Sequence, residues 1–419
     1  MDHILITGAR PLKGQVTAAG AKNSALPILA STLLGGGECV IDNLPQVRDV
    51  ATMKMLLSLL GASVKAEGSQ VIIDTESVQS LEAPYDLVKT MRASVLVLGP
   101  LLARFGEAIV SLPGGCAIGP RPVNLHLQGL TKLGAQITLE HGYIRAHATR
   151  LRGDRIDLET PTVTGTENLM MAACLAEGTT VLNNAAMEPE IIDLAKFLIQ
   201  RGAKIHGAGT GRIVIDGVSA LHGGEHRVVP DRIETGTFLI AGAMTGGDVE
   251  VLGCVPGHLD SVVSKLRECG VVVEEGPESL RVKALNRVKA VDVQTFPYPG
   301  FPTDLQPQIM AMMCVADGTS VISEMVFEGR FLHVSELQRM GAQITVDGAR
   351  AVVKGFSTLT GAPVMASDLR ASAGLILAGL AAEGETQVSR VYHLDRGYER
   401  IEDKLQGLGA IIHRVKGAA

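Results

Sequence analysis

One pattern decides the fold, and it first appears in the segment Val50-Ala-Thr-Met-Lys-Met-Leu-Leu-Ser-Leu-Leu-Gly61-Ala-Ser-Val64. Apolar residues at positions 50, 53, 56, 57 and 60 recur at helical spacing and predict a helix with one buried face. Gly61 follows at the point where a helix needs a left-handed cap before the chain turns. The segment therefore predicts a helix, a glycine turn and a short strand.

The same turn occurs six times along the 419 residues. Its glycines are Gly61, Gly134, Gly202, Gly270, Gly341 and Gly409, and the steps between them are 73, 68, 68, 71 and 68 residues. Further upstream, each of five units shows a second apolar helix, over residues 24–34, 168–176, 236–244, 306–315 and 372–382. The chain is therefore predicted to contain six α/β units, each ordered helix, strand, helix, strand, often with a final hairpin strand.

Units of this length exceed the ~20–50 residues of solenoid repeats, so we predict two globular domains of three units each. Residues 222–231, which contain Gly223, Gly224, His226 and Pro230, are expected to form the linker. The strand Ile4-Leu-Ile is expected to pair with the C-terminal half. The predicted lobes are residues 1–21 plus 230–419 and residues 22–229, and a cleft between them would suit a small ligand.

The composition excludes several classes of protein. The formal net charge of −6 argues against general binding to nucleic acid or to an anionic membrane. The N-terminus has no signal-peptide pattern, and the apolar run at 371–382 is shorter than the ~20 residues that span a bilayer. We therefore expect a soluble, cytoplasmic protein that is a monomer or a weak homo-oligomer.

The six cysteines, at positions 39, 116, 174, 254, 269 and 314, include no Cys-x-x-Cys pair. They therefore predict neither a zinc site nor a disulfide framework. No Gly-x-Gly-x-x-Gly or Walker motif occurs in the proper context. We predict no organic cofactor and no metal.

One cysteine stands apart, in the segment Ser111-Leu-Pro-Gly-Gly-Cys116-Ala-Ile-Gly-Pro-Arg121-Pro122. Glycine and proline at this density predict a shaped loop, and Pro122 is well placed to begin the helix that follows. A thiol near an arginine and a helix N-terminus suits chemistry on an anion. The alternative is a turn that carries a buried, inert cysteine.

Five motifs lie in order along the chain: Gly20-Ala-Lys22-Asn23-Ser-Ala-Leu-Pro, the Cys116 segment, Phe301-Pro-Thr-Asp304-Leu-Gln, Val326-Phe-Glu-Gly-Arg330-Phe and Asp395-Arg396-Gly-Tyr-Glu-Arg. Together they resemble the UDP-N-acetylglucosamine 1-carboxyvinyltransferase family of enolpyruvyl transferases. The resemblance implies a two-domain inverse α/β barrel. It also implies transfer of the enolpyruvyl group of phosphoenolpyruvate to the 3-hydroxyl of UDP-N-acetylglucosamine, which opens peptidoglycan precursor synthesis.

The resemblance assigns roles to particular residues. Cys116 becomes the proton donor, and its thiolate the group that adds to phosphoenolpyruvate. Asp304 becomes either the general base for the 3-hydroxyl or only a ligand of that hydroxyl, whereas alone it reads as a helix cap. Lys22, Arg121 and Arg396 are expected to clamp phosphoenolpyruvate.

The resemblance also supplies a larger substrate-binding set. Its members are Lys22, Asn23, Arg92, Arg121, Pro122, Val123, Asn124, Leu125, Thr162, Val163, Thr164, Asp304, Val326, Arg330, Asp368, Arg370 and Arg396. An exposed ion pair is the alternative reading of Asp368 and Arg370. The chain departs from many relatives at Asn124, where they carry Asp, and in residues 160–167, so its nucleotide contacts are expected to differ.

Two rival functions remain at this stage. One is the same chemistry on another alcohol, such as shikimate 3-phosphate. The other is a non-catalytic sensor of a UDP-sugar, against which the intact set of Lys22, Cys116, Asp304 and Arg396 argues. For the enzyme, we expect the sugar nucleotide to bind first and the lobes to close with the Cys116 loop as a lid.

Overall fold

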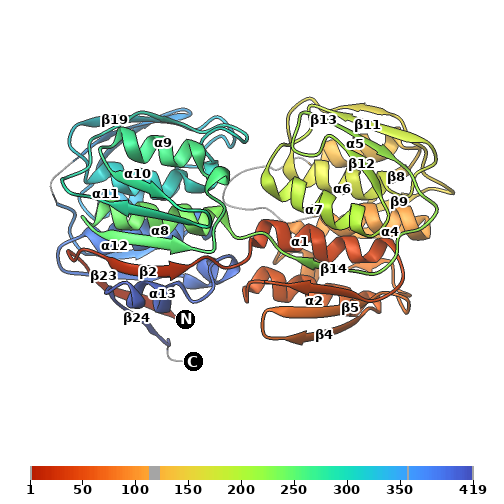
Figure 1. The fold of residues 1–419 in the computed structure, drawn as a ribbon, viewed down its shortest axis with the longest axis horizontal. Coiled ribbons are helices and arrows are strands. Elements are labelled where there is room, and N and C mark those ends of the chain that lie inside the picture. Colours follow the sequence, from red (N-terminus) through yellow and green to blue (C-terminus); the bar gives the residue numbers. More distant parts are fainter. Residues whose placement is uncertain (1, 113–122, 356–357, 418–419) are drawn as a thin grey trace. The chain divides into compact units, whose positions relative to one another are not determined.

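The computed structural model describes residues 2–112, 123–355 and 358–417, and the chain forms two compact units (Figure 1). Among the described residues, unit 1 contains 2–19 and 230–417, and unit 2 contains 20–112 and 123–229. Each unit has three four-stranded sheets and a set of deeply buried helices. The predicted enolpyruvyl-transferase-like fold of six α/β units, three in each domain, is confirmed.

Unit 2 has its three sheets in the strand orders β14-β3-β5-β4, β6-β7-β9-β8 and β10-β11-β13-β12. The strands are β3 (Cys39–Asp42), β4 (Ser63–Glu67), β5 (Gln70–Asp74), β6 (Glu82–Ala83), β7 (Glu107–Ser111), β8 (Gln136–Glu140), β9 (Tyr143–His147), β10 (Arg155–Asp157), β11 (Thr179–Asn183), β12 (Lys204–His206), β13 (Arg212–Asp216) and β14 (Gly224–Arg227). The inner helices are α1 (Lys22–Ser31), α4 (Leu98–Phe105) and α6 (Val163–Ala173). The other helices of this unit include α2 (Arg48–Leu60), α3 (Tyr85–Val88), α5 (Asn124–Lys132) and α7 (Pro189–Gln200).

Unit 1 has sheets in the orders β22-β23-β1-β24, β16-β17-β15-β2 and β18-β19-β21-β20. The strands are β1 (His3–Thr7), β2 (Lys13–Thr17), β15 (Asp248–Leu252), β16 (Val272–Glu275), β17 (Ser279–Lys283), β18 (Val293–Gln294), β19 (Thr319–Ser323), β20 (Gln343–Asp347), β21 (Arg350–Lys354), β22 (Pro363–Met365), β23 (Glu385–Ser389) and β24 (Ile411–Val415). The inner helices are α8 (Arg232–Met244), α10 (Gln306–Cys314) and α12 (Leu369–Ala381). The other helices include α9 (Asp260–Glu268), α11 (Val334–Arg339) and α13 (Ile401–Gly407).

All six sheets share one pairing pattern, in which an edge strand runs parallel to its neighbour and the remaining pairs are antiparallel. The six repeated glycines all have a left-handed φ, between 83° at Gly270 and 107° at Gly61. A side chain at such a backbone angle would be strained, which explains why glycine ends each outer helix. The repeat read from the sequence is therefore a structural repeat.

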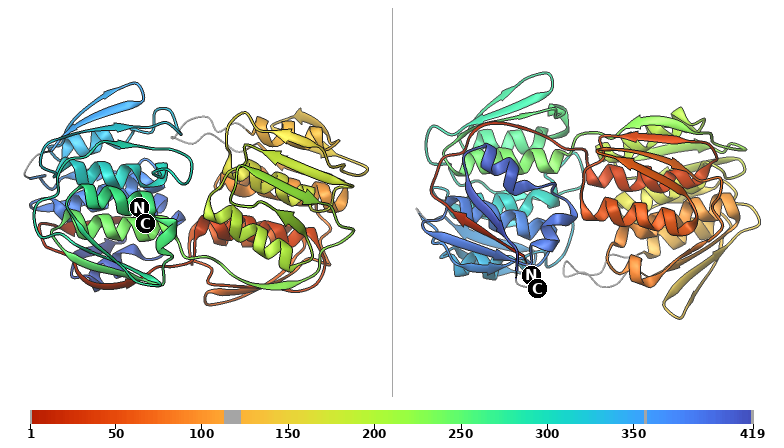
Figure 2. Two further views of the ribbon diagram at one scale, coloured as in Figure 1. Left: turned by 45° about the horizontal axis from the view of Figure 1, so that its top comes forward. Right: turned by 90° about the horizontal axis from the view of Figure 1, so that it is seen from below.

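The N-terminal strand and the predicted linker have different outcomes. Strand β1 lies between β23 and β24 in unit 1, so the predicted pairing with the C-terminal half is confirmed. The two ends of the chain lie together there, and the amide of Gly417 donates to Asp2 (Figure 2). The linker prediction was wrong for residues 224–227, because they form strand β14 along the edge of β3. An edge strand tolerates the glycine and polar residues that suggested a loop.

The inner helices of unit 1 point the same way. Residues at or just beyond the C-terminal ends of α8, α10 and α12 line a single cavity of about 450 Å³. Their N-terminal ends therefore gather at the opposite end of the helix layer. These helices are buried on all sides, as expected of helices that are apolar around their whole circumference.

Candidate active site

Asp304 is the centre of the polar cluster in unit 1. It lies in the turn η4 (Thr303–Leu305), which leads directly into α10. Its Oδ1 accepts a hydrogen bond from Arg330 Nη1 at 3.0 Å, and its Oδ2 accepts from Arg370 Nε at 3.1 Å and Nη2 at 2.9 Å. The two arginine side chains are 3% exposed and that of Asp304 is 22% exposed. A partly exposed carboxylate is thus held by two buried guanidinium groups.

The helix-cap reading of Asp304 was wrong, because the cap positions are occupied by Pro302 for η4 and by Leu305 for α10. The exposed-ion-pair reading of Asp368 and Arg370 was also wrong, because both are buried and have different partners. Asp368 caps α12 by accepting the backbone N–H of Arg370 at 2.9 Å and of Ala371 at 3.0 Å. The cap fixes the first turn of α12 and with it the direction of Arg370.

The charge of Arg370 follows from its surroundings. Burial lowers the pKa of this guanidinium, but the charges of Asp304, Tyr398 and Asp231, together with the hydrogen bond to Asp304, outweigh burial, and the pKa of Arg370 is raised. Arg370 is therefore a permanent cation. A buried cation is stable only when it is paired and hydrogen-bonded, and Asp304 provides both for Arg370.

In unit 2, Lys22 and Asn23 begin the inner helix α1. Lys22 Nζ lies 3.3 Å from Asp49 Oδ2, and Asp49 is buried in the first turn of α2. The neighbouring Ser24 donates to Asp193 of α7, whose carboxylate also accepts from the backbone N–H of Val229. These contacts fix the start of α1, where two of the predicted substrate residues lie.

A second cluster in unit 2 is centred on Asn168, a buried residue of α6 that the sequence reasoning missed. Its Oδ1 accepts from the backbone N–H of Gly99 at 2.7 Å. Its Nδ2 therefore faces Val95 O at 3.0 Å and His126 Nδ1 at 3.1 Å. One amide thus joins η2 (Arg92–Val97), α4, α5 and α6, the elements that carry Arg92, Leu125 and residues 162–164.

The Asn168 amide also sets the state of His126. Because Nδ1 accepts a hydrogen bond, the imidazole carries its proton on Nε2, which lies 3.4 Å from Thr164 Oγ1. Burial lowers the pKa of His126 to about 4, so the ring is neutral near pH 7. The sequence offered one clue to it, since His126 follows Leu125 in the predicted nucleotide segment.

The remaining predicted residues are placed as follows. Cys116, Arg121 and Pro122 lie outside the described residues. Val123 is half-buried just before α5, and Asn124 is its exposed first residue. Thr162 caps α6 by accepting from the backbone N–H of Gly165 at 3.3 Å, and Val163 and Thr164 form the first turn. In unit 1, Val326 is half-buried after β19 and Arg396 is half-buried at the end of η5 (Val391–Arg396).

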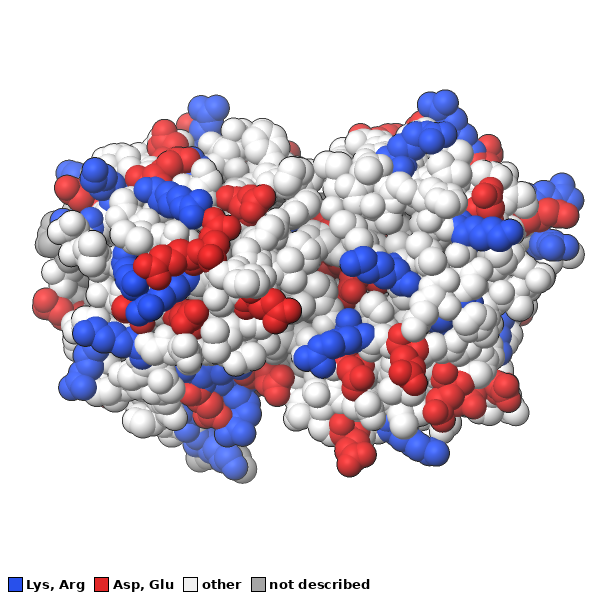
Figure 3. Space-filling model, in the orientation of Figure 1, with Lys and Arg blue, Asp and Glu red and all other residues white. Residues whose placement is uncertain are grey.

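The described residues contain no group of three or more His, Cys, Asp or Glu side chains placed to hold a metal ion. Within the same residues, none of the helices combines the length and the apolar character needed to cross a membrane. Figure 3 shows acidic and basic side chains mixed over the visible face of each unit. This mixture agrees with the small net charge of the chain.

The chain is similar to known proteins over nearly its whole length. Residues 6–405 match the family model of EPSP synthase (3-phosphoshikimate 1-carboxyvinyltransferase). The chain is 58% identical over 416 residues to the UDP-N-acetylglucosamine 1-carboxyvinyltransferase of Geotalea daltonii, an alignment that covers 99% of this chain and 100% of that one. It is 59% identical, with the same coverage, to the enzyme of that name from Geobacter metallireducens.

Solved structures agree with these sequence matches. The enolpyruvyl transferase NikO from Streptomyces tendae superposes with a TM-score of 0.90 at 26% identity, covering 100% of this chain and 99% of that one. An EPSP synthase from Acinetobacter baumannii, at 18% identity and a TM-score of 0.78, covers 99% of this chain and 100% of its own and shares the fold. The chain therefore belongs to the EPSP synthase family of enolpyruvyl transferases, on the branch of the UDP-N-acetylglucosamine 1-carboxyvinyltransferases.

Proposed function

We propose that this chain transfers the enolpyruvyl group of phosphoenolpyruvate to the 3-hydroxyl of UDP-N-acetylglucosamine and releases phosphate. This reaction is the first committed step of peptidoglycan precursor synthesis. One observation carries the proposal: enzymes named for this transfer are 57–59% identical to the chain over 99% of its length.

The reaction requires three events. A proton is added to the methylene carbon of phosphoenolpyruvate, the sugar hydroxyl attacks the adjacent carbon, and phosphate then leaves as a proton is lost from the methyl group. Cys116 is our candidate for the proton donor, and its sulfur for the atom that forms a covalent adduct with the enolpyruvyl group. Lys22, Arg121 and Arg396 would supply the positive charge that phosphate and carboxylate require.

Asp304 is our candidate for the residue that receives the 3-hydroxyl. Two guanidinium groups favour its anionic form, and an anion accepts a hydrogen bond from an attacking alcohol. Its partial exposure leaves it open to a substrate, whereas Arg330 and Arg370 are closed off. Asp304 would therefore orient the hydroxyl whether or not it also takes the proton.

The nucleotide half of the substrate is proposed to bind residues 162–164 and the segment from Arg121 to Leu125, with Arg92. The start of α6 supports this assignment, because a helix N-terminus offers backbone N–H donors to an anion, and the neutral His126 beside Thr164 adds no negative charge. Asn124 also adds no negative charge beside a diphosphate. We further propose a cytoplasmic enzyme, monomeric or weakly oligomeric, that needs no cofactor or metal and closes around its substrates.

A phosphate-release assay tests the proposed function. Purified protein is given phosphoenolpyruvate with either UDP-N-acetylglucosamine or shikimate 3-phosphate, and free phosphate is followed with time. We expect turnover only with the sugar nucleotide. Turnover only with shikimate 3-phosphate would contradict the assignment, and UDP-sugar binding without turnover would indicate a sensor.

The role of Cys116 has its own test. Cys116→Ser should abolish or severely reduce turnover while UDP-N-acetylglucosamine binding, measured by calorimetry, is largely kept. The variant should also resist epoxide inactivators such as fosfomycin, which require a thiolate to alkylate. Equal inactivation of the wild-type protein and the variant would refute this role.

A further inference from the structure

Glu324 is a buried carboxylate that none of the predicted roles uses. It follows the last residue of β19, and only 1% of its surface is exposed. Its backbone is fixed, because its N–H donates to Ala349 O at 2.8 Å. A buried carboxylate is costly unless donors surround it, so the identity of its donors shows what it holds in place.

One oxygen of Glu324 organises the turn that carries Val326. Its Oε1 accepts from the backbone N–H of Val326 at 2.9 Å and of Phe327 at 3.0 Å. It also accepts from the hydroxyl of Thr295 at 2.8 Å. The carboxylate thus fixes the backbone of a residue assigned to the sugar-nucleotide site.

The other oxygen reaches the Asp304 cluster through Thr303. Glu324 Oε2 accepts from Thr303 Oγ1 at 2.9 Å, and Thr303 Oγ1 accepts from Arg330 Nη1 at 2.8 Å. A hydroxyl has one proton, so donation to Glu324 turns a lone pair of Thr303 toward Arg330. The same Arg330 Nη1 donates its second proton to Asp304 Oδ1 at 3.0 Å.

We propose that Glu324 is a positioning residue for the acceptor site. It fixes the direction of the Thr303 hydroxyl, which fixes Arg330, which in turn orients the carboxylate of Asp304. It also holds the Val326 turn, so one buried anion sets two sides of the place where the acceptor hydroxyl and its sugar nucleotide would bind. The identity of that acceptor rests on the proposed function, whereas the relay of hydrogen bonds does not.

Glu324→Gln separates the two oxygens of the carboxylate. The amide oxygen must face Val326 and Phe327, because their backbone N–H groups are donors only. The amide nitrogen then faces Thr303, whose hydroxyl can no longer donate in that direction. The Val326 turn is therefore kept, and the orientation of Thr303 and Arg330 is lost.

The experiment is steady-state kinetics with UDP-N-acetylglucosamine as the varied substrate, together with the thermal midpoint of each variant. For Glu324→Gln we expect kcat to fall about 10- to 100-fold, since small displacements of reacting groups have effects of this size, with KM nearly unchanged. Glu324→Ala, which also releases the Val326 turn, should lower kcat and raise KM. Thr303→Val should reproduce the effect of Glu324→Gln, and Thr303→Ser should restore kcat.

Glu336→Gln is the matched control. Glu336 is also a carboxylate of unit 1 that accepts a backbone N–H, from Met365 at 3.0 Å, and it is not a member of the chain of hydrogen bonds from Glu324 through Thr303 and Arg330 to Asp304. Its kcat should stay within about twofold of wild type, as expected for a substitution outside the site.

Two results would overturn the proposal. One is a Glu324→Gln protein with a lower thermal midpoint but an unchanged kcat, which would make Glu324 a scaffold residue only. The other is Thr303→Val at wild-type kcat, a result that stands even if Glu324 variants do not fold. If the wild-type protein transfers to another alcohol, the proposed function fails, and the same variants are then assayed with that alcohol.

Discussion

The two polar clusters both involve inner helices, but one is built from charged groups and the other from neutral groups. In unit 1, charges meet at the start of α10 and α12, where Asp304 joins Arg330 and Arg370. In unit 2, neutral groups meet along α6, where Asn168 joins His126 of α5. Inner helices thus contribute to both clusters, and the residue type at each position decides whether the cluster is charged or neutral.

The difference has an energetic reason. A buried ion pair strongly destabilises the fold when one partner is removed, because the other charge is left uncompensated. Removing one member of a buried neutral network lowers the free energy of unfolding by less, because each missing hydrogen bond leaves only an uncharged polar group unsatisfied. A single substitution in the Asp304 cluster should therefore lower the free energy of unfolding more than a single substitution in the Asn168 cluster.

The largest effect is expected from Asp304→Asn. The amide can keep its oxygen toward Arg370, but its nitrogen then faces Arg330 Nη1, which is also a donor. We expect a loss of about 3 kcal/mol in the free energy of unfolding, as for a broken buried pair. Turnover should fall at least about 100-fold, because a positioned acid–base group contributes that much. Urea titration measures the free energy of unfolding, and the phosphate-release assay measures turnover. Full activity in a stable variant would show that Asp304 only closes a salt bridge.

A smaller effect is expected on the free energy of unfolding at acidic pH, through His126. The pKa of His126 is about 4 in the folded chain because of burial, against an ordinary value near 6.5. Between these two pH values the unfolded chain binds more protons at His126 than the folded chain. The contribution of the neutral ring to the free energy of unfolding is therefore fully present above pH 6.5 and is lost as pH falls toward 4. Through this window His126 contributes on the order of 3 kcal/mol to the pH dependence of unfolding.

The measurement is the free energy of unfolding at several pH values between 7 and about 4 for wild type, His126→Gln and the control His206→Gln. His206 is an exposed residue of β12 in the same unit. His126→Gln should show a shallower decline than wild type, and His206→Gln the same decline. Because His333 in unit 1 also has a pKa of about 4 through burial, part of the slope remains in every variant.

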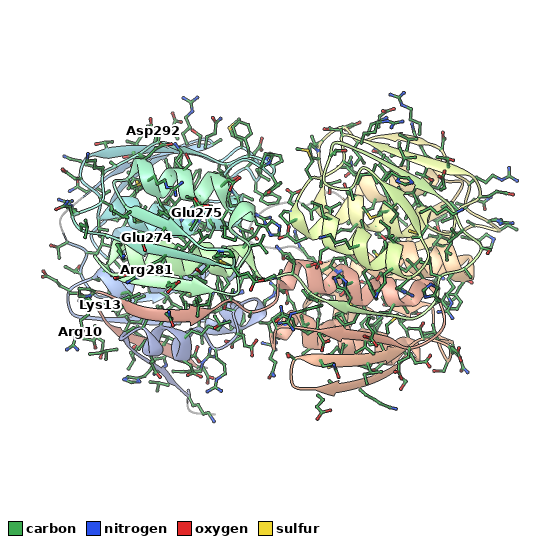
Figure 4. The ribbon with its side chains drawn as sticks, in the orientation of Figure 1. Arg10, Lys13, Glu274, Glu275, Arg281 and Asp292 are labelled. Carbon is green, nitrogen blue, oxygen red and sulfur yellow. The ribbon has the colours of Figure 1, made fainter. Side chains whose placement is uncertain are left out.

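The smallest effect tests whether burial, rather than hydrogen-bond geometry, makes the loss of the Asp304 charge costly to stability. Asp248 and Arg281 form a bidentate pair with bonds of 2.7 and 2.8 Å, shorter than those at Asp304, and Figure 4 labels Arg281 on unit 1. Their side chains are 36% and 39% exposed. Asp248→Asn should therefore cost less than about 1 kcal/mol and leave turnover unchanged. A loss as large as that of Asp304→Asn would contradict the comparison.

Much of the fold was predictable because it repeats. Glycines such as Gly61 and Gly270 mark helix ends through a backbone requirement that is local, and the apolar runs mark helices buried on all sides. Residues 224–227 were misread because strand formation there depends on β3, which lies far away in the sequence. The predicted roles of Cys116, Arg121 and Pro122 remain predictions.

The sequence by itself determined the number of units, the helix–strand order around each repeated glycine and the family to which the chain belongs, but not the parallel edge strand of each sheet. It did so because periodicity, glycine turns and motifs are properties of neighbouring residues. Only the tertiary structure decided that Asp304 pairs with two arginines, that Asp368 caps a helix and that Glu324 connects Thr303 to Val326. Such pairings depend on burial and on hydrogen-bond direction between segments far apart in the chain, and no local pattern encodes them.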